Sequence, residues 1–278
     1  MEGCNCGCGR KEVDGHGENH GQQGMISVVG TGPGGLDHLT PAASKAITAA
    51  DVIVGYRTYL DLIPELLVGK EVLSSTMMQE VDRCAKVLDL AECGKRVALV
   101  SGGDPGIYAM AGLVFEMAAQ RESRLAIEVI PGIAAVNGCA ARLGAPLMHD
   151  FAAISLSDLL TPWELIERRL EAAGMADFVI ALYNPKSKKR TENIVRAREI
   201  LLSHRPSTTP VGIVTAATRD DEVITLTTLG AMLDADIGMQ STVIIGNAST
   251  FVWNGHMVTP RGYAGKYQLD KDKSCSCA

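Results

Sequence analysis

A glycine pair that directly follows a buried strand constrains this chain more than any other feature. Residues 97–100 read Val-Ala-Leu-Val, an uninterrupted apolar run that predicts a buried strand. The strand leads into Gly102-Gly103 and then Asp104-Pro105, which we expect to cap and start the helix predicted over 107–119. Glycines at the carboxyl end of a strand let a ligand approach the backbone, and α/β proteins bind ligands at that edge. A tight turn without a ligand would use the same residues.

Two further segments repeat this design. Residues 26–29 form a short apolar strand, and the run Gly30-Thr31-Gly32-Pro33-Gly34-Gly35 follows it. Residues 126–130 form another strand, which ends in Pro131-Gly132 and leads into an alanine-rich helix. Turns that follow three strands in this way predict a parallel sheet, with the turns gathered where its ligand crevice opens.

The first glycine run contains the letters G-x-G-x-x-G, but its context excludes a nicotinamide site. A dinucleotide fold begins its helix inside the glycine loop, whereas the helix expected here, residues 42–50, begins only after Thr40-Pro41. The acid that binds the ribose should end the second strand, but Asp51 precedes the strand at 52–54. Asp51 is therefore expected at the edge of the sheet where it could not bind the ribose.

The second half of the chain starts a new α/β run after a break at Gly144-Ala145-Pro146. Its expected strands cover 152–156, 177–183, 210–215, 223–228 and 241–245. The close spacing of the last strands predicts some antiparallel pairing and therefore a mixed sheet. The fold class is α/β, with a domain at 25–145 and another at 146–267. Segments 1–24 and 268–278 are expected to be disordered tails.

Composition excludes several classes of function. Among the 278 residues, only 4% are aromatic and the net charge is −6, so nothing predicts a nucleic-acid surface. No apolar run approaches the length of about 20 residues that spans a bilayer, and no apolar segment resembling a signal peptide begins the chain. We therefore expect a cytoplasmic protein that binds neither nucleic acid nor membrane.

The cysteines are placed unevenly. The end segments hold Cys4, Cys6, Cys8, Cys275 and Cys277, with His16 and His20 nearby. These are possible ligands for a metal or an iron–sulfur cluster, although the spacing matches no zinc finger, and a tail without a site remains the alternative. The inner thiols, Cys84, Cys93 and Cys139, are expected to be small buried apolar groups.

Taken together, these segments resemble the tetrapyrrole (precorrin) methyltransferase family from Met25 to about Tyr267. The matching motifs are Gly30-Thr31-Gly32-Pro33-Gly34, Gly103-Asp104-Pro105, Pro131-Gly132-Ile133-Ala134-Ala135 and Ile245-Gly246-Asn247. The resemblance implies two α/β domains with S-adenosylmethionine in the cleft between them, a tetrapyrrole substrate and a homodimer.

Within this family the chain is most similar to the branch that methylates C-17 of precorrin-3B or cobalt-precorrin-3 and contracts the macrocycle in cobalamin biosynthesis. The residues that carry the similarity to this branch are Val54-Gly55-Tyr56, Tyr59, His149-Asp150-Phe151, Ser155-Leu156-Ser157-Asp158, Tyr183-Asn184-Pro185 and Thr218-Arg219-Asp220-Asp221. Many relatives carry an aspartate where this chain has Gly35, a departure that fits the same branch. Methylation of another carbon of a precorrin or uroporphyrinogen, and a nucleotide-binding module without catalysis, remain as alternatives.

The resemblance also implies which residues contact S-adenosylmethionine. They are Pro33, Gly102, Gly103, Asp104, Ile107, Tyr108, Ile133, Ala134, Ala135, Tyr183, Asn184, Ala216 and Ala217. Simple helix packing would also explain one or two of Ile133, Ala134 and Ala135.

Ring contraction moves protons, and its acid–base candidates are His149, Asp150 and Tyr56. Each of them could instead have a structural role. Because the implied substrate carries many carboxylates, local cations near loop edges are candidate contacts. These cations are Arg57, Lys186, Lys188, Arg190 and Arg219, although residues 186–190 would also suit a solvated helix start.

Overall fold

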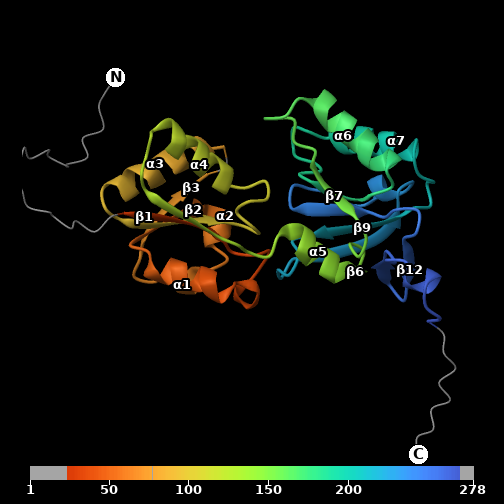
Figure 1. The fold of residues 1–278 in the computed structure, drawn as a ribbon, viewed down its shortest axis with the longest axis horizontal. Coiled ribbons are helices and arrows are strands. Elements are labelled where there is room, and N and C mark those ends of the chain that lie inside the picture. The colour runs from red at the N-terminus through yellow and green to blue at the C-terminus, as the bar shows by residue number, and fades with distance from the viewer. Residues whose placement is uncertain (1–23, 77, 270–278) are drawn as a thin grey trace, which may run out of the picture. The chain divides into compact units, whose positions relative to one another are not determined.

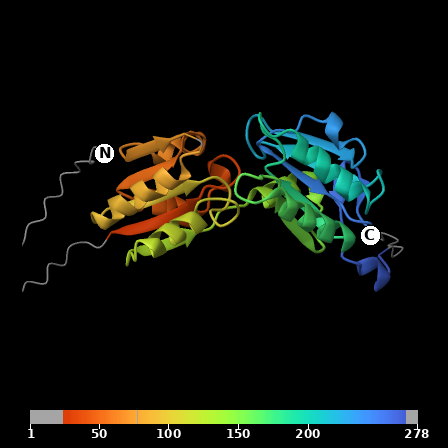
Figure 2. The ribbon, with the colours of Figure 1, turned by 90° about the horizontal axis from the view of Figure 1, so that it is seen from above.

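A computed structural model describes residues 24–76 and 78–269 of the chain. Two compact units are present, one ending at Ala134 and the other beginning at Ala135. Figures 1 and 2 show that each unit is built around its own sheet with helices packed against it. The cysteines of the two end segments lie outside the described residues, as do His16 and His20.

The sheet of the first unit is parallel throughout. Its strands stand in the order β3-β2-β4-β1-β5, and every neighbouring pair runs in the same direction. In chain order they are β1 (Met25–Gly30), β2 (Val52–Tyr56), β3 (Glu71–Ser75), β4 (Arg96–Ser101) and β5 (Ala126–Ile130). All five strands therefore end at one edge, which we call the carboxyl edge of unit 1. The gathering of the glycine turns at a single edge is confirmed.

Helices cover both faces of this sheet (Figure 1). On one side are α1 (Pro41–Ala49) and the short α2 (Arg57–Leu60), and on the other are α3 (Glu80–Glu92) and α4 (Ala111–Gln120). Val29 is buried with α1, whereas its neighbour Val28 is buried with α3 and α4, because successive strand residues point to opposite faces. Coverage on both faces explains why these strands read as continuous apolar runs.

Local capping signals explain where α1 begins but not where α4 begins. The Thr40 hydroxyl accepts a hydrogen bond from the backbone N–H of Ala43 at 3.1 Å, as its position before Pro41 predicts. The helix after β4 was expected from residue 107 but begins at Ala111. Tyr108 has a left-handed backbone with φ of +52°, which is incompatible with a right-handed helix and delays its start.

The sheet of the second unit is mixed, as expected, in the order β10-β9-β11-β8-β7. Its strands are β7 (Phe151–Ser155), β8 (Val179–Tyr183), β9 (Pro210–Thr215), β10 (Val223–Thr228) and β11 (Ser241–Ile245). Strands β7 and β8 are parallel, and β11 runs antiparallel to both β8 and β9. Consequently β7, β8 and β9 share one direction, and their ends form the carboxyl edge of unit 2. A smaller sheet joins β12 (Phe251–Trp253), β13 (His256–Val258) and β6 (Gly144–Ala145).

Helices α6 (Trp163–Met175) and α7 (Glu192–Leu202) cover one face of this sheet, and α5 (Ala135–Leu143) covers the other. A Cβ on Gly212 of β9 would lie only 2.4 Å from Leu143 Cδ1, so α5 packs directly on the central strands. The division between the units therefore lies before Ala135, about a helix earlier than the expected break at Gly144-Ala145-Pro146. Gly144 and Ala145 of that expected break instead form the short strand β6.

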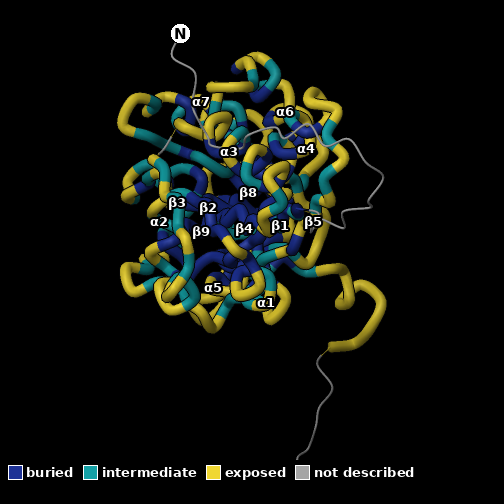
Figure 3. Tube along the Cα trace, turned by 90° about the vertical axis from the view of Figure 1, so that its left-hand side faces the viewer, coloured by how far each residue is buried: buried dark blue, intermediate teal, exposed yellow. Residues whose placement is uncertain are grey.

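Burial is concentrated in the strands of the two sheets (Figure 3). Cys84 and Cys139 are buried as expected, and burial raises the pKa of each thiol to about 11. Cys93 contradicts the expectation, because it lies exposed at the end of α3. Among the described residues, no helix combines the length and apolar character that crossing a membrane requires.

Candidate functional site

The carboxyl edge of unit 1 is held together by backbone hydrogen bonds between loops. Gly32, after β1, donates to the carbonyl of Gly103 at 3.1 Å, and Gly103, after β4, donates back to Gly32 at 2.8 Å. The backbone N–H of Thr31 donates to Ser101 at 2.9 Å, and its hydroxyl donates to the same carbonyl at 3.2 Å. The glycine turns after β1 and β4 are therefore joined into one hydrogen-bonded structure.

The glycines are required because the backbones approach too closely for any side chain. A Cβ on Gly132 would lie 2.2 Å from the Gly103 carbonyl oxygen, and one on Gly30 would lie 2.6 Å from the same atom. Gly32 and Gly103 also have φ of +77° and +67°, in the left-handed region that favours glycine. Packing between loops thus explains these glycines, and it gives the edge a rigid rim of peptide groups.

Asp104 joins the loop after β4 to the loop after β5. One carboxylate oxygen accepts from the backbone N–H of Gly106 at 2.8 Å, and the other accepts from Gly132 at 3.2 Å. The expected role as a helix N-cap is wrong, since α4 begins only at Ala111. Asp104 instead holds the start of the segment that contains Ile133 and Ala134.

The remaining candidates of unit 1 lie at the same edge. Gly102 packs against the ring of Tyr59, where a Cβ would lie 2.4 Å from Cε1. Tyr59 in turn makes an edge-to-face contact with Tyr56, with ring centroids 5.4 Å apart. Ile107 and Tyr108 are 39% and 53% exposed on the non-helical turn that precedes α4. Pro33 is buried in the first loop.

Unit 2 brings its own candidates to its carboxyl edge. Val243 of β11 pairs with Leu182 on one side and Ile213 on the other, so β8 and β9 end at the same level. Tyr183 and Asn184 therefore share an edge with Ala216 and Ala217. The Tyr183 hydroxyl accepts from the backbone N–H of Val136 at 2.9 Å, which places it beside the start of α5 and next to Ala135.

Arg190, expected as a candidate contact for substrate carboxylates, has a structural role in this edge. Its guanidinium donates to the carbonyl of Asn184 at 2.9 Å and to the hydroxyl of Ser157 at 3.1 Å, with only 15% of the side chain exposed. Asn184 donates through its side chain to Ser155 at 3.0 Å and has φ of +49°. Arg190 therefore fixes the loops after β7 and β8. Among the other cations, Arg57 and Lys188 are exposed, whereas Lys186 and Arg219 are half-buried.

His149 and Asp150 lie at the opposite edge of unit 2. They precede β7, and the carbonyl of Asp150 accepts from Val179, the first residue of β8, at 3.1 Å. The imidazole Nδ1 of His149 accepts from the backbone N–H of Asp150 at 2.9 Å. A five-residue strand, about 15 Å long, separates them from Tyr183. Unit 2 therefore does not bring these acid–base candidates to its candidate cofactor residues.

That same opposite edge contains a buried arginine that sequence reasoning missed. Arg205 is 5% exposed, its guanidinium donates to the carbonyls of Gly246, Ala173 and Phe178, and burial lowers its pKa. Asn247, from the Ile245-Gly246-Asn247 motif, accepts from the backbone N–H of Ser249 at 3.0 Å and closes a turn. No local sequence pattern distinguishes Arg205 from a surface arginine.

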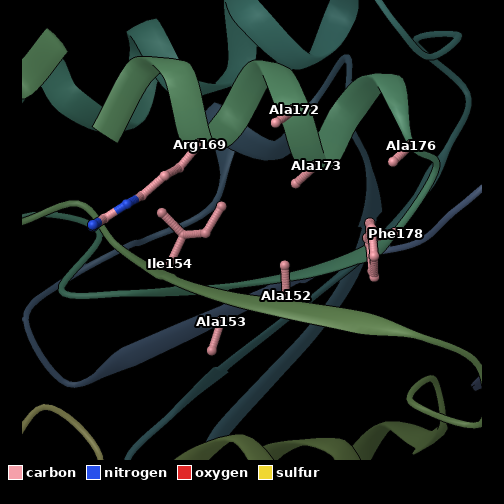
Figure 4. A pocket seen from close by; sticks show the side chains of 8 residues that line it. All are labelled: Ala152, Ala153, Ile154, Arg169, Ala172, Ala173, Ala176 and Phe178. Carbon is pink, nitrogen blue, oxygen red and sulfur yellow. The ribbon is translucent and has the colours of Figure 1, made fainter. Parts of the chain in front are cut away.

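The described residues contain no group of three or more His, Cys, Asp or Glu side chains that could hold a metal ion. A groove of about 470 Å³ lies between β7 and α6 and is lined mainly by alanines (Figure 4). None of the candidate cofactor residues lines it. The candidate cofactor residues of each unit therefore lie on the loops of that unit's own carboxyl edge or next to them, and not in this groove.

Comparisons with known proteins agree on one family. Residues 25–233 match the family model described as Tetrapyrrole (Corrin/Porphyrin) Methylases. The chain is 51% identical to "Cobalt-factor III methyltransferase" of Priestia megaterium over 90% of this chain, but it spans only about half, 47%, of that relative. It is 48% identical to "Probable cobalt-factor III C(17)-methyltransferase" of Salmonella typhimurium, covering 86% of this chain and 99% of the relative. The crystal structure of the methyltransferase CobJ aligns with a TM-score of 0.79 at 37% identity, over 85% of this chain and 100% of that one.

Proposed function

Because the chain belongs to the tetrapyrrole methylase family, we propose that it transfers a methyl group from S-adenosylmethionine to C-17 of precorrin-3B or its cobalt-containing counterpart. In this proposal the reaction contracts the macrocycle and forms part of cobalamin biosynthesis. The observation that carries it is the similarity to the Salmonella typhimurium relative, at 48% identity over 99% of its length. The match to "Precorrin-3B C(17)-methyltransferase" of Sinorhizobium sp, 42% identical over 99% of that protein, supports the same position of methylation.

The carboxyl edge of unit 1 fits such a cofactor. S-adenosylmethionine supplies an activated methyl group with its own leaving group, so the protein needs to position the reactants and exclude water. The edge offers half-exposed backbone at Gly102 and Gly103 beside the exposed apolar side chains of Ile107 and Tyr108. Backbone donors and acceptors next to apolar surface match a ligand made of a nucleoside and an amino acid.

The proposed cofactor contacts extend to the second unit. The full set is Pro33, Gly102, Gly103, Asp104, Ile107, Tyr108, Ile133, Ala134, Ala135, Tyr183, Asn184, Ala216 and Ala217. Three of these, Tyr108, Asn184 and Ala216, have φ of +52°, +49° and +51°. Left-handed backbone at residues other than glycine is uncommon and clusters at functional sites, which supports these positions.

Of the three acid–base candidates, we assign the proton-handling role to Tyr56. Its ring contacts Tyr59, which packs on Gly102, so Tyr56 lies at the edge that carries the proposed cofactor loops. His149 and Asp150 lie at the amino ends of β7 and β8 and share no edge with Tyr183. A phenol can donate or accept a proton once the substrate carbon develops charge.

The test is anaerobic incubation with S-adenosylmethionine labelled in its methyl group and either precorrin-3B or its cobalt form. Mass spectrometry should show one added methyl group, and NMR should place the label on C-17 of a contracted ring. Label on another carbon would support the alternative methyltransferase. Binding of the cofactor without transfer of label would support a nucleotide-binding module.

We further propose that the protein acts as a homodimer, as the family resemblance implies, and that it does so in the cytoplasm. Sedimentation equilibrium should then give a mass about twice the 29.5 kDa of one chain. Cell fractionation should recover the activity with the cytoplasmic proteins. A mass of one chain at micromolar concentration, or activity in the membrane fraction, would contradict the corresponding part of this proposal.

A further inference from the structure

The loop after β9 holds two residues in a backbone conformation that is unfavourable for their side chains. Ala216 has φ of +51° and Thr218 has φ of +65°. A left-handed conformation is a genuine outlier for a β-branched residue such as threonine. The Thr218 hydroxyl oxygen is also buried without a hydrogen-bond partner. Such strain persists only where surrounding groups impose it, and it is typical of functional sites.

The carboxylate of Glu222 contacts this loop directly. One of its carboxylate oxygens accepts from the backbone N–H of Thr218 at 2.7 Å. The other accepts from Arg142 of α5 twice, at 2.9 Å from Nε and 2.7 Å from Nη2. The Glu222 side chain is only 12% exposed, and its contact raises the pKa of Arg142. A charged, two-sided contact of this kind fixes the carboxylate in place.

The contact links the strained loop to helix α5, whose first residue, Ala135, is another proposed cofactor contact. Helix α5 begins at Ala135, and the N–H of its second residue, Val136, donates to the Tyr183 hydroxyl at 2.9 Å. Arg142 lies near the other end of the same nine-residue helix and binds Glu222. Helix α5 therefore contacts the end of β8 through Val136 and is linked to the loop after β9 through Arg142 and Glu222.

We propose that Glu222, held by Arg142, is a positioning residue for S-adenosylmethionine: it keeps residues 216–218 in their strained conformation and so presents the backbone of Ala216 and Ala217 to the cofactor. This inference rests on the proposed function. Glu222 acts through the loop and is not assigned any contact with the cofactor. The structural alternative is that the ion pair stabilises the fold and nothing else.

The experiment compares the Glu222→Ala and wild-type proteins by calorimetric titration with S-adenosylhomocysteine. We expect affinity to fall about tenfold and the KM for S-adenosylmethionine to rise by a similar factor, with kcat changed less than twofold. The control variant is Asp89→Asn, which disrupts an ion pair with Arg121 of similar length, 2.6 Å, on the helices of unit 1. Asp89→Asn should bind with the affinity of the wild type.

A rescue variant separates positioning from general stability. Glycine adopts the left-handed conformation without strain, so Thr218→Gly added to Glu222→Ala should restore most of the lost affinity. If Glu222→Ala does not fold, Arg142→Ala tests the same contact and should weaken binding about threefold. A folded Glu222→Ala protein with unchanged affinity, or no recovery in the double variant, would overturn the inference. Wild-type protein that binds no S-adenosylhomocysteine would overturn the proposed function as well.

Discussion

Replacing Asp104 with alanine removes two hydrogen bonds that join the loops after β4 and β5, those from Gly106 at 2.8 Å and Gly132 at 3.2 Å. A hydrogen bond to a charged group contributes about 1.5–3 kcal/mol, and a neutral one about 1 kcal/mol. Asp104 is half-buried, so the lower values apply and the free energy of unfolding should fall by about 2–3 kcal/mol. Asparagine keeps one carbonyl acceptor and should lose about half as much.

The loss of these two hydrogen bonds also predicts how far the affinity for the cofactor should fall. If S-adenosylhomocysteine binds only when the two loops are joined, the loss of these bonds by itself lowers its affinity by at most about 2–3 kcal/mol, a factor of about 30–150. Calorimetric titration measures the affinity, and urea unfolding followed by circular dichroism measures the stability. Asp104→Asn should lie between the wild type and Asp104→Ala in both measurements.

Asp51 provides the matched control, because it also accepts a backbone hydrogen bond, from Arg96 at 2.8 Å, in the same unit. It precedes β2 and therefore lies at the edge opposite the glycine loops. Asp51→Ala should lower stability without changing the affinity for S-adenosylhomocysteine. Asp104→Ala protein that loses stability but binds normally would refute the reasoning, since the joined loops would then lie outside the site.

Three further predictions follow from the geometry. Gly132→Ala places a Cβ 2.2 Å from the Gly103 carbonyl oxygen and should lower stability by about 3 kcal/mol in thermal unfolding, whereas Gly35→Ala, with open space around it, should have no effect. His149→Ala should leave both affinity and turnover unchanged in the methyl-transfer assay, and slower product formation would instead assign it the acid–base role. The backbone N–H of Arg96 holds the pKa of Asp51 below its usual range. Asp51 therefore stabilises the fold above its unfolded-state pKa and loses this effect as pH falls through its folded-state pKa. The difference in unfolding free energy between wild type and Asp51→Asn, measured in urea, should therefore shrink below about pH 4; a constant difference would contradict it.

Local sequence patterns predicted the bounds of an element correctly where those bounds depend only on neighbouring residues. The predicted strands at 210–215, 223–228 and 241–245 have the observed bounds, because each is an apolar or β-branched run between turn residues. The start of α1 followed from Thr40-Pro41, whose effect is confined to one helical turn. The family resemblance and the two-sheet α/β fold are also confirmed.

Contacts between distant residues explain what the sequence did not predict. Asp104 resembles an N-cap in its local context, but its partner Gly132 lies 28 residues away. Glu222 and Arg142 are 80 residues apart, and no spacing rule connects them. The break at Gly144-Ala145-Pro146 looks like a linker, yet packing of α5 on β9 assigns that helix to the second unit.

The placement of His149 could have been predicted from the sequence. Asp51 was excluded from a ligand site because it precedes its strand, and residues before a strand lie at the edge opposite the loops that follow it. His149 and Asp150 precede the strand at 151–155 in the same way. Applying one rule to both positions leaves Tyr56, which ends its strand, as the candidate at a carboxyl edge. Strand direction therefore places His149 and Asp150 at the edge of unit 2 opposite Tyr183 and Asn184.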